Sequence, residues 1–286
     1  MSPENSDRPA YSKNAVAARL NELHYGKPAI VVEGESDFEF WNSIRLREVE
    51  VLPAQGRKAV IEGVEYFQDK AVGVVDDDYE QLLNCTGNPI GPNLFSTKKP
   101  NDIESLLLQA WFKQGKGYIS PNRDYGFRLI TRRQVKSAIG LSRKIGILRL
   151  INHIEDWGLR FRDETSRIAP WLKEFVKCVE EDGEEGTKVL IGGIKKNSQN
   201  VKLGEREILD RYNQAEIEYR NVCDFTLTNG HDLSKTIDIL TNGIARSKEI
   251  ERWLRREVRP NVSDFELFQG IKAWSNETGI GLITLN

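Results

Sequence analysis

The stretch IVVEGESD, from Ile30 to Asp37, and the stretch VVDDD, from Val74 to Asp78, decide the fold of this chain. Each is a short apolar run that ends abruptly in carboxylates. Apolar runs of this length are typical of strands buried on both faces of a parallel sheet. Parallel strands present their carboxyl ends at one edge of the sheet, where open α/β folds bind ligands. We therefore expect the two acidic ends to meet at that edge.

Further strand and helix signals surround these two stretches. Strands are expected at 28–33, 49–52, 71–75 and 93–97, and helices at 11–24, 36–47 and 57–69, with another beginning at 101 or 102. Ser36 is the expected N-cap of the second helix. This alternation predicts an α/β fold, a parallel sheet with right-handed crossovers that is sandwiched by helices.

Beyond residue 120 the pattern becomes mainly helical. Helices are expected at 131–156, 168–182, 204–222, 231–241, 245–257 and 263–275, with loops around a short strand at 189–191 and a last strand within 279–285. We therefore divide the chain into a catalytic core with its N-terminal helix, residues 1–119, and a mainly helical region that packs on the core, residues 120–286.

The composition favours a cytoplasmic protein without a membrane segment. Of 286 residues, 39% are hydrophobic and 29% charged, and no run approaches the roughly 18 apolar residues of a membrane span. The polar N-terminus has no apolar centre of the kind found in signal peptides. Cys85, Cys178 and Cys223 are odd in number and widely spaced, as expected for reduced thiols.

The net charge of -2 conceals an uneven distribution of charge along the chain. Residues 1–119 carry 13 Lys and Arg against 18 Asp and Glu, whereas residues 120–170 carry 11 against 5. An acidic segment beside a basic one suits an enzyme that acts on a polyanion. These basic side chains equally fit a solvated helix face. They are Arg123, Arg128, Arg132, Arg133, Lys136, Arg143, Lys144 and Arg149. Tyr125 and Phe127 lie nearby in the sequence and are candidates for base stacking.

The carboxylates at the two strand ends form a candidate metal site. Side chains alternate along a strand, so Asp76 and Asp78 are expected to point one way and Asp77 the other. Together with Glu33 they would chelate Mg²⁺ or Mn²⁺, which prefer carboxylate oxygen. Asp37 falls in the first turn of the following helix, where the helix dipole also favours an acid. Asp37 as a capping acid, and Asp78 as a helix N-cap, are the alternatives.

The sequence EGESD, beginning at Glu33, resembles the EGxxD motif of the Toprim domain, and DDD at 76–78 resembles its DxD motif. That domain occurs in primases, topoisomerases, small RNA-maturing nucleases and the OLD family. The resemblance implies a compact parallel sheet between helices. It also implies acid/base chemistry or metal binding for Glu33, and Mg²⁺ binding for Asp76 and Asp78, with Asp77 at the variable position.

Two further segments narrow the resemblance. Thr97 to Glu104, TKKPNDIE, is similar to the TxxxxDxE segment of OLD-like Toprim proteins, which implies that Glu104 supports a second metal. Glu104 equally fits a capping-box acid paired with Asn101. The segment NGHDLSK, from Asn229 to Lys235, is similar to a signature of Toprim effectors from PARIS-type phage-defence systems.

His231 and Lys235 lie in that last segment, one helical turn apart. A histidine there would serve as a general acid/base or contact a phosphate. Lys235 would neutralise charge in a phosphoryl transition state. A structural hydrogen bond at a helix N-terminus is the alternative for His231.

The resemblance implies an Mg²⁺- or Mn²⁺-dependent endonuclease that uses two ions. It further implies a toxic effector of phage defence, held inactive by an ABC-type ATPase and released on infection to cut host nucleic acid. RNA such as tRNA is the favoured substrate, and a homodimer is the expected active form.

Four alternatives remain open at this point. The chain would instead be a DNA-cleaving OLD-like nuclease, or a non-catalytic Toprim module that binds an ATPase. It would also fit a primase- or topoisomerase-like enzyme, although it carries no cysteine set for a zinc module. The last alternative is an unrelated α/β phosphotransferase with Asp76 as its nucleophile.

Overall fold

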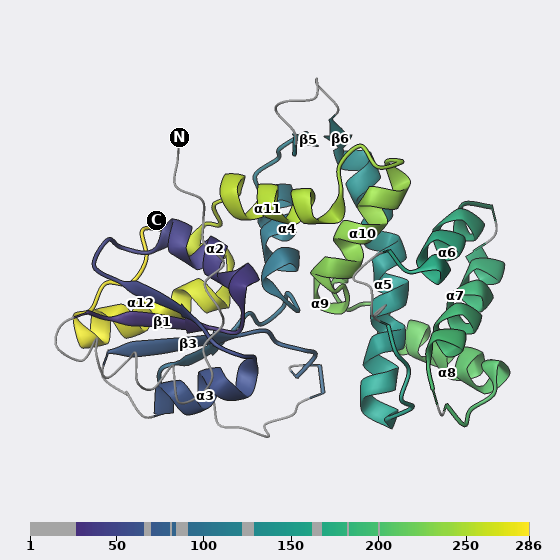
Figure 1. Ribbon diagram of the computed structural model, residues 1–286, viewed down its shortest axis with the longest axis horizontal. Helices are drawn as coiled ribbons and strands as arrows, with labels where there is room; N and C mark the ends of the chain where they lie inside the picture. The colour runs from purple at the N-terminus through teal and green to yellow at the C-terminus, as the bar shows by residue number, and fades with distance from the viewer. Residues whose placement is uncertain are drawn as a thin grey trace. The chain divides into compact units, whose positions relative to one another are not determined.

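The computed structural model describes residues 27–65, 70–80, 82–83, 91–121, 129–161, 168–181, 183–199 and 201–285 (Figure 1). The chain forms two compact units. The first comprises the chain up to Trp111 together with residues 255–286, and the second comprises residues 112–254. This division differs from the expected one because the last segment packs with the sheet-containing unit. The helix expected at 11–24 lies outside the described residues.

A parallel sheet forms the centre of the first unit. Its strands stand in the order β2-β1-β3-β4, and they are β1 (Ala29–Val32), β2 (Glu50–Pro53), β3 (Ala71–Val75) and β4 (Leu94–Ser96). Val31 pairs with Leu52 on one side and with Gly73 on the other, and Val75 pairs with Ser96. Strands β1 and β3 are buried along their whole length. The predicted α/β class is confirmed.

Helices cover both faces of this sheet. They are α2 (Glu35–Ile44), α3 (Arg57–Glu65), most of α4 (Ile103–Lys113) and α12 (Glu266–Thr278), which follows the short helix η1 (Val262–Asp264). Figure 1 shows α2 and α3 on opposite faces. Val60 and Val64 of α3 pack in one apolar cluster with Val31. On the α2 side, the Phe268 ring of α12 lies 5.8 Å from the Trp41 ring, between centroids.

The C-terminal segment is held to the first unit by its backbone as well as by its side chains. The N–H of Leu46 donates to the carbonyl of Leu282 at 2.9 Å, and the N–H of Thr284 donates to the carbonyl of Ile44 at 2.7 Å. Instead of the full strand expected within 279–285, the structure has a single antiparallel bridge between Arg45 and Ile283. These bonds explain why the end of the chain belongs with the sheet.

The second unit is built from helices around α5. Its elements are β5 (Tyr118–Ile119), β6 (Ile130–Thr131), α5 (Arg132–Glu155), α6 (Pro170–Glu181), α7 (Gly183–Asn197), α8 (Glu205–Glu218), α9 (Asp224–Leu227) and α10 (Gly230–Leu240). Helix α11 (Ser247–Glu257) begins in this unit, and its last turn, from Arg255, belongs to the first. Helix α5 packs against α8, α9 and α10. The predicted, mainly helical C-terminal region is confirmed.

The prediction of a strand at 189–191 is wrong, because these residues lie within α7. A short apolar run does not by itself distinguish a strand from a buried helix turn. The glycines that suggested loops are positions of close packing. A Cβ at Gly193 would lie 2.3 Å from the Cβ of Trp171, and one at Gly186 would lie 2.1 Å from a methyl of Val179. Glycine therefore lets α7 approach α6 closely.

Candidate metal centre

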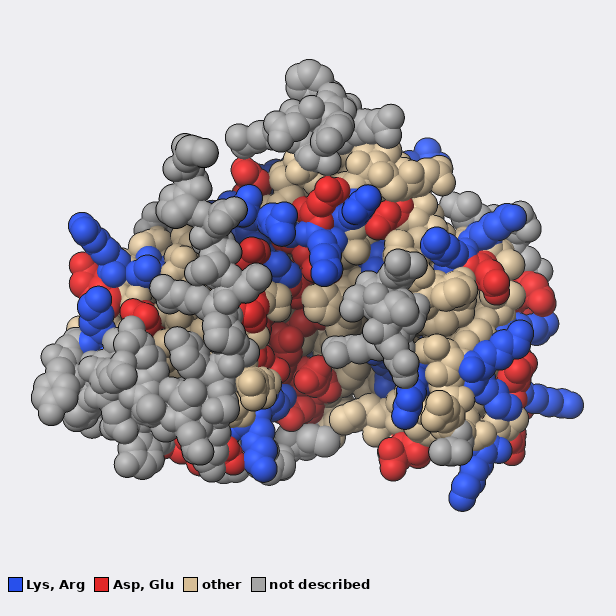
Figure 2. Space-filling view, in the orientation of Figure 1, with Lys and Arg blue, Asp and Glu red and all other residues tan. Residues whose placement is uncertain are grey.

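The two acidic strand ends meet at the carboxyl edge of the sheet. Glu33 directly follows β1, and Asp76 directly follows the neighbouring strand β3. The N–H of Asp76 donates to Oε1 of Glu33 at 2.9 Å. In the view of Figure 2, acidic side chains gather near the starts of α2 and α4, which Figure 1 shows in the same orientation. The expected meeting of the two strand ends is therefore present.

Asp37 reaches this edge from the first turn of α2. The N-cap of α2 is Gly34 rather than Ser36. The N–H of Gly34 donates to Oδ2 of Asp37 at 3.2 Å, which satisfies a backbone donor that would otherwise be unpaired at the helix start. Asp37 therefore does cap the helix, and its charge also acts on the neighbouring carboxylates.

Five carboxyl groups influence one another at this edge, and we call them the acidic cluster: Glu33, Asp37, Asp76, Asp102 and Glu104. Burial raises the pKa of Asp76 well above its usual value, and the other four carboxylates raise it further. Burial likewise raises the pKa of Asp37 to about 7, with Glu104 and Glu33 contributing through charge. The pKa of Glu33 is also raised, again mainly by burial. The cluster thus holds more negative charge than its surroundings neutralise.

Glu104 lies in the first turn of α4 and is 3% exposed. It is not the capping acid of that helix. Asp102 has that role instead, because its Oδ1 accepts the N–H of Ser105 at 2.9 Å. Asn101 is engaged elsewhere, with its Oδ1 accepting the N–H of Tyr79 at 3.0 Å. The sequence analysis placed the start of this helix at 101 or 102 but missed the charge of Asp102 in the cluster.

Arg255 is the residue of this site that sequence reasoning missed most clearly. It comes from the last turn of α11 and is 7% exposed. Its Nε and Nη2 donate to the same oxygen of Glu104, Oε1, at 3.2 and 2.8 Å. Its Nη1 donates to Oε2 of Glu39 at 3.2 Å. No local pattern points to this pair, since the two residues are 151 positions apart.

Asp77 and Asp78 do not follow the alternation of the strand, because β3 ends at Val75. Asp77 is buried, and its N–H donates to Oγ1 of Thr97, the residue after β4, at 3.0 Å. Asp78 is exposed and has a left-handed backbone with φ of 44°. Its charge raises the pKa of Glu33, so it lies at the Glu33 side of the site.

Arg57 places a positive charge at the same side. It is the first residue of α3, and its Nη1 donates to the carbonyl of Asp76 at 3.0 Å. Its Nη2 pairs with Oε2 of Glu80 at 2.5 Å. The charge of Arg57 lowers the pKa of Glu33, against the larger effect of burial. A cation in this position can hold a phosphate beside the carboxylates.

The donor set fits a hard divalent metal. No three acidic, His or Cys side chains among the described residues already stand in a coordinating arrangement, so the carboxylates would have to turn toward a common point. Their chemistry is that of Mg²⁺ and Mn²⁺ ligands, oxygen only. A cavity of about 10 Å³ is bounded by Asp37, Asp76 and Thr97, among others. That is room for about one water molecule or one small ion.

His231 and Lys235 belong to the second unit, whereas the acidic cluster belongs to the first. Asn229 is the N-cap of α10, and its Oδ1 accepts the N–H of Asp232 at 3.4 Å. Nδ1 of His231 lies 2.9 Å from Oε1 of Glu251 in α11, and the His231 side chain is 46% exposed. Lys235 is half-buried one turn later. His231 therefore makes the structural contact that the alternative expected, and its ring still remains partly exposed to solvent.

Asp232, the acid of the same motif, has a structural partner. Its Oδ2 accepts Nε of Arg149 at 2.7 Å and its Oδ1 accepts Nη2 at 3.1 Å. The guanidinium of Arg149 also lies 4.4 Å from the centroid of the Phe161 ring. This paired contact fastens α10 to α5. The motif therefore anchors a helix as well as presenting His231.

The basic segment is only partly available for a ligand. Arg143 pairs with Asp224 at 3.0 Å and Lys144 pairs with Glu216 at 3.3 Å, within the second unit. Arg132, Arg133 and Lys136 are exposed near the start of α5, and Nη2 of Arg132 donates to the carbonyl of Phe112 at 3.2 Å. Arg149 pairs with Asp232, and the members that lie outside the described residues are Arg123, Tyr125, Phe127 and Arg128.

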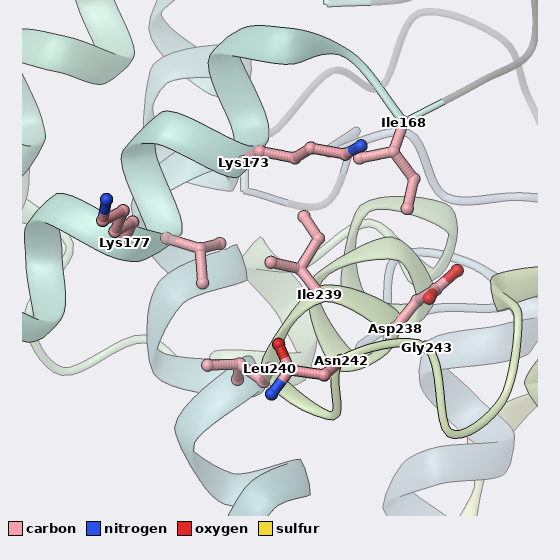
Figure 3. Close-up of a pocket in the computed structure, with 9 residues that line it drawn as sticks. Ile168, Lys173, Lys177, Asp238, Ile239, Leu240, Asn242 and Gly243 are labelled. Carbon is pink, nitrogen blue, oxygen red and sulfur yellow. The ribbon is translucent and has the colours of Figure 1, made fainter.

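A separate open pocket of about 700 Å³ lies in the second unit (Figure 3). Lys173 and Lys177 line it from α6, and Asp238, Asn242 and other residues line it from the end of α10. Oδ2 of Asp238 already accepts the N–H of Ser247 at 3.0 Å. The lining mixes both signs of charge, so it lacks the excess of carboxylate that marks the acidic cluster.

No helix within the described ranges is long and apolar enough to cross a membrane. Cys178 and Cys223 form no disulfide within the described residues, and Cys85 lies outside them. Comparison of the chain with protein-family models, with curated proteins and with solved structures finds no match. The family resemblance therefore depends on the motifs themselves and on the geometry of the site that they occupy.

Proposed function

We propose that the chain is a metal-dependent endonuclease of the Toprim type, which hydrolyses phosphodiester bonds. The observation that carries this proposal is the acidic cluster. Carboxylates from the ends of β1 and β3 and from the starts of α2 and α4 converge there without enough positive charge to neutralise them. Proteins tolerate such a concentration of buried charge when a divalent cation completes it.

The residues divide the work of the site as follows. Glu33, Asp76 and Asp78 would hold one ion, and Glu104 with Asp37 would help to hold a second. Bound there, Mg²⁺ or Mn²⁺ would supply an activated water and stabilise the charge of the leaving oxygen. Asp37, with its pKa raised to about 7, would give up its proton when the site loads.

Glu33 is suited to proton transfer as well as to binding. Its Oε1 is fixed by the N–H of Asp76, and burial raises its pKa. A carboxyl group held in this way can accept a proton from the attacking water. Arg57 would hold the phosphate of the substrate, and His231 and Lys235 would contribute acid/base chemistry and charge neutralisation.

The biological setting follows from the motif at 229–235 and is part of the proposal. The chain would be a cytoplasmic toxic effector of phage defence, kept inactive by an ABC-type ATPase and released on infection. Its substrate would be host RNA such as tRNA, and its active form a homodimer. The exposed cations Arg132, Arg133 and Lys136 would contribute to binding a polyanion.

Expression of the wild type and of Glu33→Gln in cells tests this function. We expect growth arrest with the wild type alone, and new 5′ and 3′ ends in the sequenced cellular RNA. Glu65→Gln, which changes an exposed acid of α3 away from the cluster, is the matched control and should remain toxic. New ends in DNA alone would make the chain a DNA-cleaving nuclease, and equal toxicity of Glu33→Gln would rule out catalysis at this site.

One observation favours a second candidate, a non-catalytic module that binds the ATPase. Arg255 already supplies a positive charge to Glu104, as it would in a site that no longer loads metal. In that case the chain would bind its partner normally, and neither the wild type nor Glu33→Gln would generate nucleic-acid ends.

A further inference from the structure

Arg255 contacts Glu104 in an unusual way. A guanidinium commonly engages both oxygens of a carboxylate through two parallel bonds. Here Nε and Nη2 of Arg255 both donate to Oε1 of Glu104, at 3.2 and 2.8 Å. The remaining nitrogen, Nη1, donates to Glu39 instead, at 3.2 Å. The guanidinium thus holds one oxygen of Glu104 and leaves Oε2 outside its fork.

From this fixed position the Glu104 carboxylate acts on other members of the acidic cluster. Among charges, it has the largest effect on Asp37, and it also acts on Asp76. Glu104 and Arg255 are 3% and 7% exposed, so water offers little competition for the contact between them. Arg255 therefore holds Oε1 of Glu104, while the charge of the same carboxylate acts on Asp37 and Asp76.

Arg255 stands at the edge of the cluster and does not take the place of a bound ion. The hydrogen bonds of Arg255 to the cluster go to Glu104, so a cation that binds among the other four carboxyl groups would still be favourable.

We propose that Arg255 is a positioning residue, which fixes Glu104 through Oε1 so that Oε2 serves as a metal ligand. This inference rests on the proposed metal-dependent function. Partners that orient a metal-binding carboxylate change metal affinity by about 10- to 100-fold when they are lost. Lysine cannot replace the fork, because a single ammonium cannot hold Glu39 and both contacts to Glu104 in one plane.

Calorimetric titration of the full chain with Mn²⁺ tests this role directly. Arg255→Lys keeps the charge and removes the fork, and we expect it to weaken Mn²⁺ binding by about 10-fold or more. Arg256→Lys, at an exposed position of the same helix, is the matched control and should bind as the wild type does. Glu39→Gln removes the charge of the second carboxylate that Arg255 contacts, and it should change Mn²⁺ affinity by less than about 3-fold, because the contact with Glu104 remains.

A double-mutant cycle separates positioning from a purely structural ion pair. If Arg255 acts through Glu104, Arg255→Lys should weaken Mn²⁺ binding in the wild type and add almost nothing in Glu104→Gln. Equal Mn²⁺ affinity of Arg255→Lys and the wild type would overturn the positioning role, and so would additive effects of the two changes. Absence of saturable Mn²⁺ binding by the wild type would instead overturn the proposed function itself.

Loss of folding in Arg255→Lys would be detected by its melting temperature, and Glu104→Asp then decides the question. The shorter side chain cannot both hold Arg255 and reach a metal ion that the other carboxylates bind. We expect at least about 10-fold weaker Mn²⁺ binding by a folded Glu104→Asp protein. Wild-type affinity in that variant would overturn the proposal.

Discussion

The acidic cluster of the first unit and the start of α10 in the second unit use charged residues in opposite ways. At α10, Asp232 meets Arg149 through two hydrogen bonds, and His231 meets Glu251. In the acidic cluster the carboxylates outnumber the cations that reach them, and the pKa values of Asp37 and Asp76 rise as a result. Paired charges hold elements together, whereas charges left in excess are suited to bind something from outside.

The same substitution in the two regions should therefore have opposite effects on stability. Replacing Asp by Asn removes a charge and keeps the shape of the side chain. In the acidic cluster this relieves repulsion, and at α10 it leaves a cation without its partner. The predictions below use this contrast, beginning with the largest effect.

Asp76→Asn should abolish cleavage while stabilising the fold. We expect activity to fall by about 10³-fold, because a metal ligand is lost. At pH 8 the metal-free variant should be more stable to unfolding than the wild type by about 1 kcal/mol, because a buried, uncompensated charge is gone. Cleavage assays and denaturant melts in EDTA measure the two effects. A variant that is both active and less stable would contradict the idea that Asp76 is a metal ligand carrying uncompensated charge.

Asp232→Asn should destabilise the second unit. Arg149 would lose its charged partner beside the Phe161 ring, at a cost of about 3 kcal/mol in the free energy of unfolding. Denaturant melts of the full chain, compared with Asp76→Asn, give the measurement. A neutral outcome would mean that the motif acid does not anchor α10.

His231→Gln should reduce cleavage by about 10²-fold if the imidazole transfers a proton. The fold should be little affected, because the side chain is 46% exposed. His153→Gln changes an exposed histidine of α5 and is the matched control. Equal activity of the two variants would assign His231 a structural role only.

The metal-free protein should lose stability as the pH rises from about 4 to about 7. The pKa of Asp37 is about 7 in the folded chain and 3.8 in its unperturbed state, so the folded form binds more protons across this window. Asp76 acts in the same direction. Melting temperatures in EDTA between pH 5 and pH 8 should fall, and saturating Mg²⁺ should flatten the trend. Stability that rises with pH in EDTA would contradict the shifted pKa values.

Local signals were enough to predict the sheet and the centre of the site. The runs that end at Glu33 and Asp76 are buried strands followed at once by acids, and parallel pairing brings their ends together. Asp78 was harder to place, because the alternation of a strand stops where β3 stops, at Val75. The left-handed turn that follows decides where Asp78 points.

Long-range partners were beyond the reach of the sequence. In the sequence, Arg255 is one more basic residue of an amphipathic helix. It comes to lie beside Glu104 only because the C-terminal segment folds as part of the first unit. The helix α7 was missed for a related reason. Gly186 and Gly193 suggested loops in the sequence, but in the structure they allow α7 to pack closely against α6.

Calorimetric titration with Mn²⁺ at pH 7 tests the central claim, that the acidic cluster is a metal site, most directly. Run in two buffers of different ionisation enthalpy, it measures ions bound and protons released together. We predict saturable binding of about two ions per chain with release of a proton, and loss of that binding in Asp76→Asn. Absence of saturable binding by the wild type, or equal binding by Asp76→Asn, would contradict the claim.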